Sequence, residues 1–190
     1  MARVLKANLF ASMETVDLAR ALLGKILVVR TADGAEVRRR IVEVEAYNGP
    51  EDLACHASRG HTPRTSVLFG PPGHWYVYLC YGIHEMLNLV TGPEGYPAAL
   101  LIRGVEGLIG PGRLTRALGI DRRHNRQPAV PDTGLWLEED GFVPPENEVQ
   151  ATPRIGVDYA GPEWAAKPWR FVWQPATEAK HATRSRRRRS

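Results

Sequence analysis

The stretch that decides the fold is EVRRRIVEVEAY, residues 36–47, which follows the apolar run KILVVR at residues 25–30 across an Asp33-Gly34 dipeptide. Asp-Gly between two β-type runs is a strong signal for a tight hairpin, so we predict antiparallel strands over both stretches. Side chains alternate between the two faces of a strand. One face should therefore carry Ile41, Glu43, Glu45 and Tyr47, and the other Val42, Val44 and Ala46.

Two short helices are predicted on either side of this hairpin. Residues 15–23 have apolar side chains at helical spacing, with Thr15 as the expected cap and Gly24 as the stop. Residues 111–118 begin with a proline and end before Gly119, which is the usual asymmetry of helix ends. A further helical turn is expected at residues 163–166.

Further strands are expected at residues 75–81, 84–90, 98–103 and 169–173, whereas residues 121–134 look like an irregular basic connection. Helices and strands do not alternate regularly, so the fold class is α+β. We expect a single domain over residues 1–175 with a curved, mainly antiparallel sheet, flanking short helices and a protruding β-hairpin.

The hairpin around Gly82-Ile83 has two alternative registers. A two-residue turn would pair Tyr81 with His84 and put Tyr78 and Asn88 on opposite faces, whereas we expect a three-residue loop to pair Tyr78 with Asn88.

Composition limits the class of protein without identifying it. The 190 residues are 43% hydrophobic, and no apolar run is long enough to span a membrane. The N-terminus lacks the features of a secretory signal, and Cys55 and Cys80 are expected to be free thiols. The whole chain has a net charge of +4, of which five arginines in residues 184–190 contribute +5. Residues 1–183 therefore carry a net charge of −1. Residues 176–190 are therefore predicted to be a basic, disordered tail that adds non-specific affinity for phosphates.

A long loop follows the central strand. Residues 48–74 are rich in Gly, Pro and charged side chains, and a loop of this length is usually either functional or disordered. Beside it the sequence offers carboxylates and several tyrosines, a combination that suits stacking a flipped base next to an acid or base. The candidate constellation is Glu43, Glu45, Tyr47, His56, Tyr76, Tyr78, Tyr81, Asn88 and Arg103.

The same residues also fit alternative roles. The tyrosines could be ordinary cross-strand packing. A cation site is a second alternative, although the spacing of its ligands matches no metal motif; they would be Glu43, Glu45, His56 and the loop acids Glu51 and Asp52.

The sequence resembles the alkyladenine (3-methyladenine) DNA glycosylase family, of the type found in mammals and many bacteria, and looks like a bacterial member. The resemblance covers nearly the whole chain up to Phe171. It rests on LLGKILVV at 22–29, IVEVEAYNGPEDLACH at 41–56, TPR at 62–64, YVYLCYGIHEMLN at 76–88, LIR at 101–103 and KPWRF at 167–171.

The resemblance implies a role for each matching residue. Glu45 looks like the general base that activates water, and Arg103 like its partner in holding that water. The base pocket would comprise Tyr47, His56, Tyr78, Asn88 as a gate against guanine, and Ile155 through its carbonyl. Because this pocket needs both Tyr78 and Asn88 near the base, we expect the longer hairpin loop or a bulge. Tyr81 looks like the wedge that enters the DNA. Backbone contacts would come from Thr62, Arg64 and Tyr76.

The implied function is base-excision repair by a monofunctional glycosylase that acts on double-stranded DNA. It would flip alkylated or deaminated purines, such as 3-methyladenine, 7-methylguanine, hypoxanthine and ethenoadenine, and hydrolyse the N-glycosidic bond. The four lysines lie outside the pocket motifs, so no lyase step is expected. We expect a monomer with no cofactor, metal or membrane partner, located in the cytoplasm at the nucleoid. The competing functions are a nucleic-acid binding module without activity and an RNA-processing transferase. An assay for abasic sites distinguishes the glycosylase, which would leave alkali-labile breaks, from a module that only binds.

One residue departs from the family pattern. Glu85 lies close to the expected wedge, where an acid would weaken the binding of phosphates.

Overall fold

The structure is a computed structural model that describes residues 2–175. The arginine tail predicted at residues 176–190 lies outside the described residues. Within them, no helix is long and apolar enough to cross a membrane.

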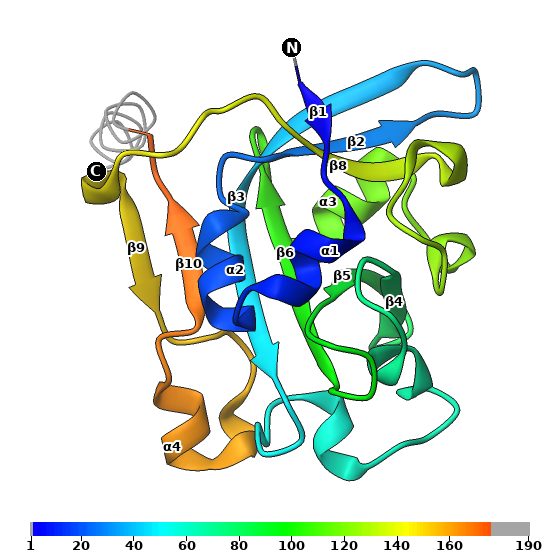
Figure 1. Cartoon of the computed structure of the whole chain (residues 1–190). Helices are drawn as coiled ribbons and strands as arrows, with labels where there is room; N and C mark the ends of the chain where they lie inside the picture. Colours follow the sequence, from blue (N-terminus) through cyan, green and yellow to red (C-terminus); the bar gives the residue numbers. More distant parts are fainter. Residues whose placement is uncertain (1, 176–190) are drawn as a thin grey trace.

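The described chain forms an open sheet with few short helices, which confirms the predicted α+β single-domain class (Figure 1). The main strand order is β1-β8-β2-β3-β6-β5-β4, with β10 paired to β3 and β9, and β7 paired to β6. All of these pairings are antiparallel. The strands are β1 (Arg3–Val4), β2 (Ile26–Arg30), β3 (Glu36–Asn48), β4 (Trp75–Cys80), β5 (His84–Val90), β6 (Ala98–Val105), β7 (Leu108–Ile109), β8 (Leu135–Glu139), β9 (Val149–Thr152) and β10 (Arg170–Trp173).

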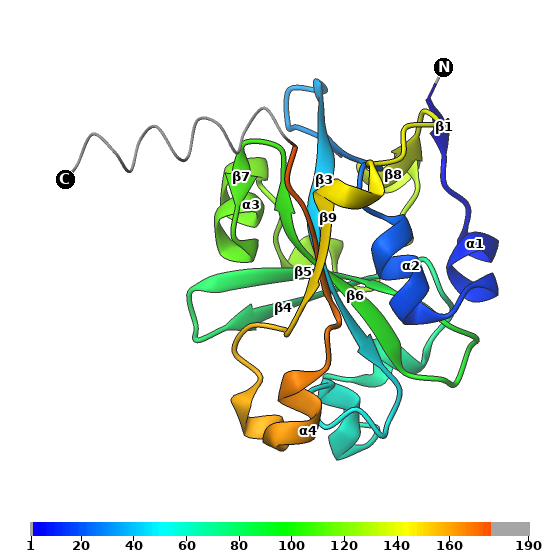
Figure 2. The same ribbon diagram turned by 90° about the vertical axis from the view of Figure 1, so that its left-hand side faces the viewer.

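Four α-helices accompany the sheet within the described residues: α1 (Ala7–Ser12), α2 (Thr15–Ala21), α3 (Pro111–Leu118) and α4 (Gly161–Ala166). Figure 2 shows α1 and α2 on one side of the central strands and α3 on the other. As predicted, α3 begins with Pro111 and ends at Gly119 in the left-handed conformation. Thr15 is not the cap of α2, because Glu14 occupies that position and the Thr15 hydroxyl instead bonds Thr91.

The core lies between these helices and the sheet, and β3 supplies much of it. Ile41, Val42, Val44 and Ala46 all belong to one buried cluster. Strict alternation of side chains along β3 predicts that Ile41 lies on the same face as Glu43 and Glu45, and that prediction was wrong. The register between β3 and β6 shifts twice, at Val42 and at Arg103, and such bulges break the two-residue period.

The β4–β5 hairpin projects from the body of the molecule (Figure 2). Its loop is Tyr81-Gly82-Ile83, which confirms the longer of the two loops, but the predicted pairing was wrong. Tyr76 pairs with Asn88 and Tyr78 with Met86, because the ladder closes at Cys80 and His84. Tyr78 and Asn88 still lie on the same face, two residues apart along the ladder.

Candidate active site

A cleft of about 650 Å³ opens between the β4–β5 hairpin, the loop after β3 and the segment before α4. Ten of the eleven residues to which the family resemblance assigns a role line it. They are Tyr47, His56, Thr62, Arg64, Tyr76, Tyr78, Tyr81, Asn88, Arg103 and Ile155. The eleventh, Glu45, is fully buried immediately behind this lining.

Three of the lining residues contact the Glu45 carboxylate. The Tyr47 hydroxyl donates to Oε2 at 2.9 Å, and the Ile155 backbone N–H donates to Oε1 at 2.8 Å. Arg103 Nη1 reaches Oε2 at 3.4 Å, and its Nε lies 3.4 Å from Oε1. Burial raises the pKa of Glu45, while the Arg103 charge and the Ile155 and Tyr47 hydrogen bonds oppose that rise.

The side chain of Glu43 lies next to Glu45 on the same face of β3. It is 3% exposed, and its Oε1 accepts the Nε–H groups of Arg103 at 3.0 Å and of Arg170 at 2.6 Å. Four alternating charges therefore cross three neighbouring strands, β10, β3 and β6. Arg170 is the member of this network that was not assigned to the site from the sequence.

Aromatic rings form one wall of the cleft. The ring centroids of His56 and Tyr78 are 4.6 Å apart, and those of Tyr76 and Tyr78 are 5.2 Å apart. His56 Nδ1 is 3.0 Å from the Tyr76 hydroxyl, and Arg64 lies over the Tyr78 ring at 5.1 Å. Burial, with the nearby Arg64 and Arg59 charges, lowers the pKa of His56 to about 4. The imidazole is therefore neutral at neutral pH.

Two lining residues come from the ends of the β4–β5 hairpin. Tyr81 at its tip is 91% exposed and has a positive φ of 51°. Asn88 near its base is 4% exposed and donates its amide N–H groups to the carbonyls of Tyr76 and Met86. Glu85 forms an ion pair with Arg122 at 3.1 Å, so its negative charge near the hairpin is compensated.

Another buried ion pair positions Ile155. Arg154 donates to both oxygens of Asp52 at 2.6 and 2.9 Å, and neither side chain is exposed. The Arg154 guanidinium also lies 4.9 Å from the Tyr47 ring centroid. No local pattern in the sequence pointed to this pair, since Asp52 looked like one of several loop acids.

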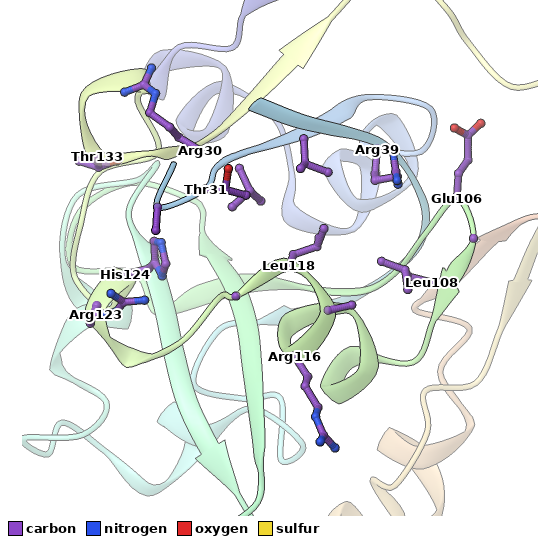
Figure 3. Close-up of a pocket in the computed structure, with 16 residues that line it drawn as sticks. Arg30, Thr31, Arg39, Glu106, Leu108, Arg116, Leu118, Arg123, His124 and Thr133 are labelled. Atoms are coloured by element: carbon purple, nitrogen blue, oxygen red, sulfur yellow. The ribbon is translucent and has the colours of Figure 1, made fainter. Parts of the chain in front are cut away.

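A larger hollow of about 960 Å³ lies elsewhere, bordered by the β2–β3 hairpin and the end of α3. Figure 3 shows that Arg30, Arg116 and Glu106 on its rim point outward and do not converge. The described residues that line it include no pair of aromatic rings beside a buried carboxylate. The chemistry of the first cleft is therefore the better candidate for an active site.

No group of three or more His, Cys, Asp or Glu side chains within residues 2–175 is arranged to hold a metal ion. Cys55 and Cys80 are both free thiols. Burial raises the pKa of Cys55 to about 11, so its thiol stays protonated at neutral pH.

A model of the methylpurine-DNA glycosylase family matches residues 9–109 and 107–177 of this sequence. The chain belongs to the methylpurine-DNA glycosylase family. Individual relatives agree with this membership. A protein of Anaeromyxobacter dehalogenans is 50% identical over 175 residues, which cover 86% of this chain and 80% of the relative.

Two further relatives are similar along most of their length. A protein of Myxococcus xanthus is 48% identical over 85% of this chain and 86% of its own length. One of Methanocella arvoryzae is 46% identical over 85% of this chain and 88% of its own. All three relatives carry the name 3-methyladenine DNA glycosylase as a provisional assignment. The residues of this methylpurine-DNA glycosylase family member that match the family model include those that line the cleft and the two strands that carry Glu45 and Arg103.

Proposed function

We propose that this protein is a DNA repair glycosylase that flips a damaged purine out of duplex DNA and hydrolyses its N-glycosidic bond. Family membership supports the reaction class. The observation that carries the proposal is a buried carboxylate, Glu45, bonded to Arg103 behind an aromatic cleft, with the exposed Tyr81 at its rim. The substrates are alkylated or deaminated purines in double-stranded DNA.

Glu45 acts as the general base. Water attacks the anomeric carbon and gives a proton to Glu45, while the bond to the purine nitrogen breaks and its electron pair leaves with the base. Arg103 holds the water. The Arg103–Glu45 contact of 3.4 Å is longer than the 2.9 Å bond from Tyr47, so it is the easier one for water to enter.

The base occupies the space between the aromatic side chains. Tyr47, His56 and Tyr78 stack against it, the Ile155 carbonyl adds a ligand for the water, and Asn88 rejects guanine through its fixed amide. Tyr81 enters the stack that the base has left. Cationic alkylated purines are good leaving groups, so one acid is sufficient for them.

Two DNA backbone contacts are proposed, Thr62 and Arg64. Tyr76, which the family resemblance placed with them, is 3% exposed and its hydroxyl faces His56. We therefore assign Tyr76 to the support of the His56 ring. Lys6, Lys25 and Lys167 are absent from the cleft lining, which favours simple hydrolysis over a lyase step.

The Glu45→Gln variant tests the mechanism. Its amide preserves the shape but cannot accept the proton, so single-turnover excision should fall by orders of magnitude while binding to lesion DNA survives. Excision is measured as alkali-labile breaks in duplexes that contain hypoxanthine or 7-methylguanine. Chelator should leave the wild-type rate unchanged.

The matched control is Glu138→Gln, since Glu138 is a buried glutamate that is paired with Arg38 and does not line the cleft. It should retain the wild-type rate. Near-normal excision by Glu45→Gln would remove Glu45 as the base. Lesion binding by the wild type without any breaks would favour a binding module instead.

A further inference from the structure

Glu43 is a buried acid to which the proposed reaction gives no task. A carboxylate that is 3% exposed needs strong compensation, and here one oxygen receives two guanidinium Nε–H groups. Arg170 in turn donates to the Thr152 hydroxyl at 2.9 Å. Glu43 therefore connects an anchored arginine on β10 with Arg103 on β6.

The backbone is shaped to permit this contact. Glu43 pairs with Gly104 and Val44 with Ile102, so Arg103 is the bulged residue that has no partner in the register. Bulges commonly redirect a side chain beside a functional site. A Cβ atom at position 104 would lie 3.2 Å from the Glu43 Cβ and 3.4 Å from its Oε2. Glycine at that position leaves room for the Glu43 side chain.

The geometry of the guanidinium makes the contact consequential. Its five N–H groups form a rigid planar fork, so fixing Nε sets the direction of both Nη groups. Glu43 binds Arg103 through Nε, and Arg103 uses Nη1 toward Glu45. Without Glu43 the longer and weaker contacts to Glu45 would be left to hold Arg103 alone.

We propose that Glu43 is a positioning residue, which holds Arg103 through Nε and thereby aims its guanidinium at Glu45 and the attacking water. The proposal rests on the glycosylase function proposed above. Glu43 does not contact the substrate, and Arg170 is the anchor that keeps Glu43 in place.

Glu43→Gln, combined with Arg103→Met in a double-mutant cycle, tests the proposal. Alone, Glu43→Gln should lower single-turnover excision about tenfold or more and leave lesion binding unchanged. In the Arg103→Met background it should have no further effect, because the residue through which it acts is gone. Additive losses, or a wild-type rate in the single variant, would overturn the proposal.

The pH profile separates positioning from a mere charge effect. Arg103 lowers the pKa of Glu45, and Glu43 raises it more weakly. If Glu43→Gln frees Arg103 from Glu45, the acidic limb of the rate profile moves to higher pH. A move to lower pH would mean that Arg103 had stayed in place and that only a like charge was lost, which contradicts positioning.

Two controls keep the result interpretable. Glu138→Gln again serves as the distant buried glutamate, and thermal unfolding checks each variant. If Glu43→Gln does not fold, Glu43→Asp replaces it, because aspartate keeps the negative charge but its shorter side chain withdraws the carboxylate from Arg103. A wild-type rate in the Glu43→Asp variant would also overturn the proposal. An inactive Glu45→Gln beside a fully active Glu43→Gln would refute only this inference, whereas an active Glu45→Gln refutes the reaction itself.

Discussion

At the scale of single residues, the protonation of Glu45 controls the proposed reaction. Burial raises its pKa, and only the deprotonated form accepts a proton, so excision should increase with pH through a value above the ordinary glutamate pKa of about 4.3. Arg103→Met removes the charge that opposes this rise. The acidic limb of the pH–rate profile of the Arg103→Met variant should therefore move to still higher pH.

The measurement is the single-turnover rate against pH on 7-methylguanine DNA, whose cationic base needs no further proton to leave. Arg116→Met, at the rim of the larger hollow, is the control and should leave the limb in place. A limb at or below the ordinary glutamate pKa would contradict the burial argument. So would an Arg103→Met profile that does not move.

Most members of the candidate site could be predicted from the sequence, but their contacts could not. Alternation along residues 36–47 placed Glu43, Glu45 and Tyr47 on one face, and the structure agrees. Arg103 and Ile155 lie 58 and 110 residues from Glu45, so no local pattern could show that they bond its carboxylate. Arg170 was missed because a strand arginine resembles any solvated cation until its partner is known.

At the scale of elements, strands with clear turn residues were predicted well and short elements were not. The β2–β3 hairpin followed from Asp33-Gly34, and α3 from its proline and glycine ends. The α1 helix has six residues and β8 reads LWLEE, so neither shows a sustained period. Glu138 of β8 is buried because Trp136 Nε1 and Arg38 bond it, which composition could not reveal.

The tip of the β4–β5 hairpin is both strained and exposed. Tyr81 adopts a left-handed backbone conformation, which costs a non-glycine residue on the order of 1 kcal/mol, and its ring is 91% exposed. Tyr81→Gly removes both the strain and the ring. The unfolding temperature should stay level or rise, while excision falls most for lesions in stable base pairs.

Excision of hypoxanthine is compared in a matched pair and in a mismatch, which is already easier to flip. Ile109→Ser removes a different exposed apolar side chain and should affect neither substrate. Equal losses on both duplexes would show that Tyr81 acts on something other than flipping. A large drop in unfolding temperature would instead make the ring structural.

At the scale of the whole molecule, the Asp52–Arg154 pair joins segments 102 residues apart. It ties the loop after β3 to the segment before α4, and Arg154 also donates to the carbonyls of Ala46 and Trp164. These bonds hold Ile155 beside Glu45. Residues 48–74 were predicted to be a functional or disordered loop, and the structure shows that parts of it are packed, with Ala54, Cys55 and Leu68 buried.

Asp52→Asn is expected to destabilise the whole domain while it disturbs the site. Both side chains are fully buried, and removal of one partner leaves the other charge without compensation, which costs about 3–5 kcal/mol. Urea denaturation should show this loss as a lower midpoint. Asp140→Asn, which breaks the solvent-accessible pair with Arg40, is the matched control and should shift the midpoint much less.

Because Arg154 is followed directly by Ile155, the Asp52 variant should also lose excision under conditions in which it is still fully folded. Equal urea midpoints for the Asp52→Asn and Asp140→Asn variants would mean that the carbonyl and ring contacts of Arg154 are enough to hold it in place. The Asp52–Arg154 pair would then not be the contact that joins the loop after β3 to the segment before α4.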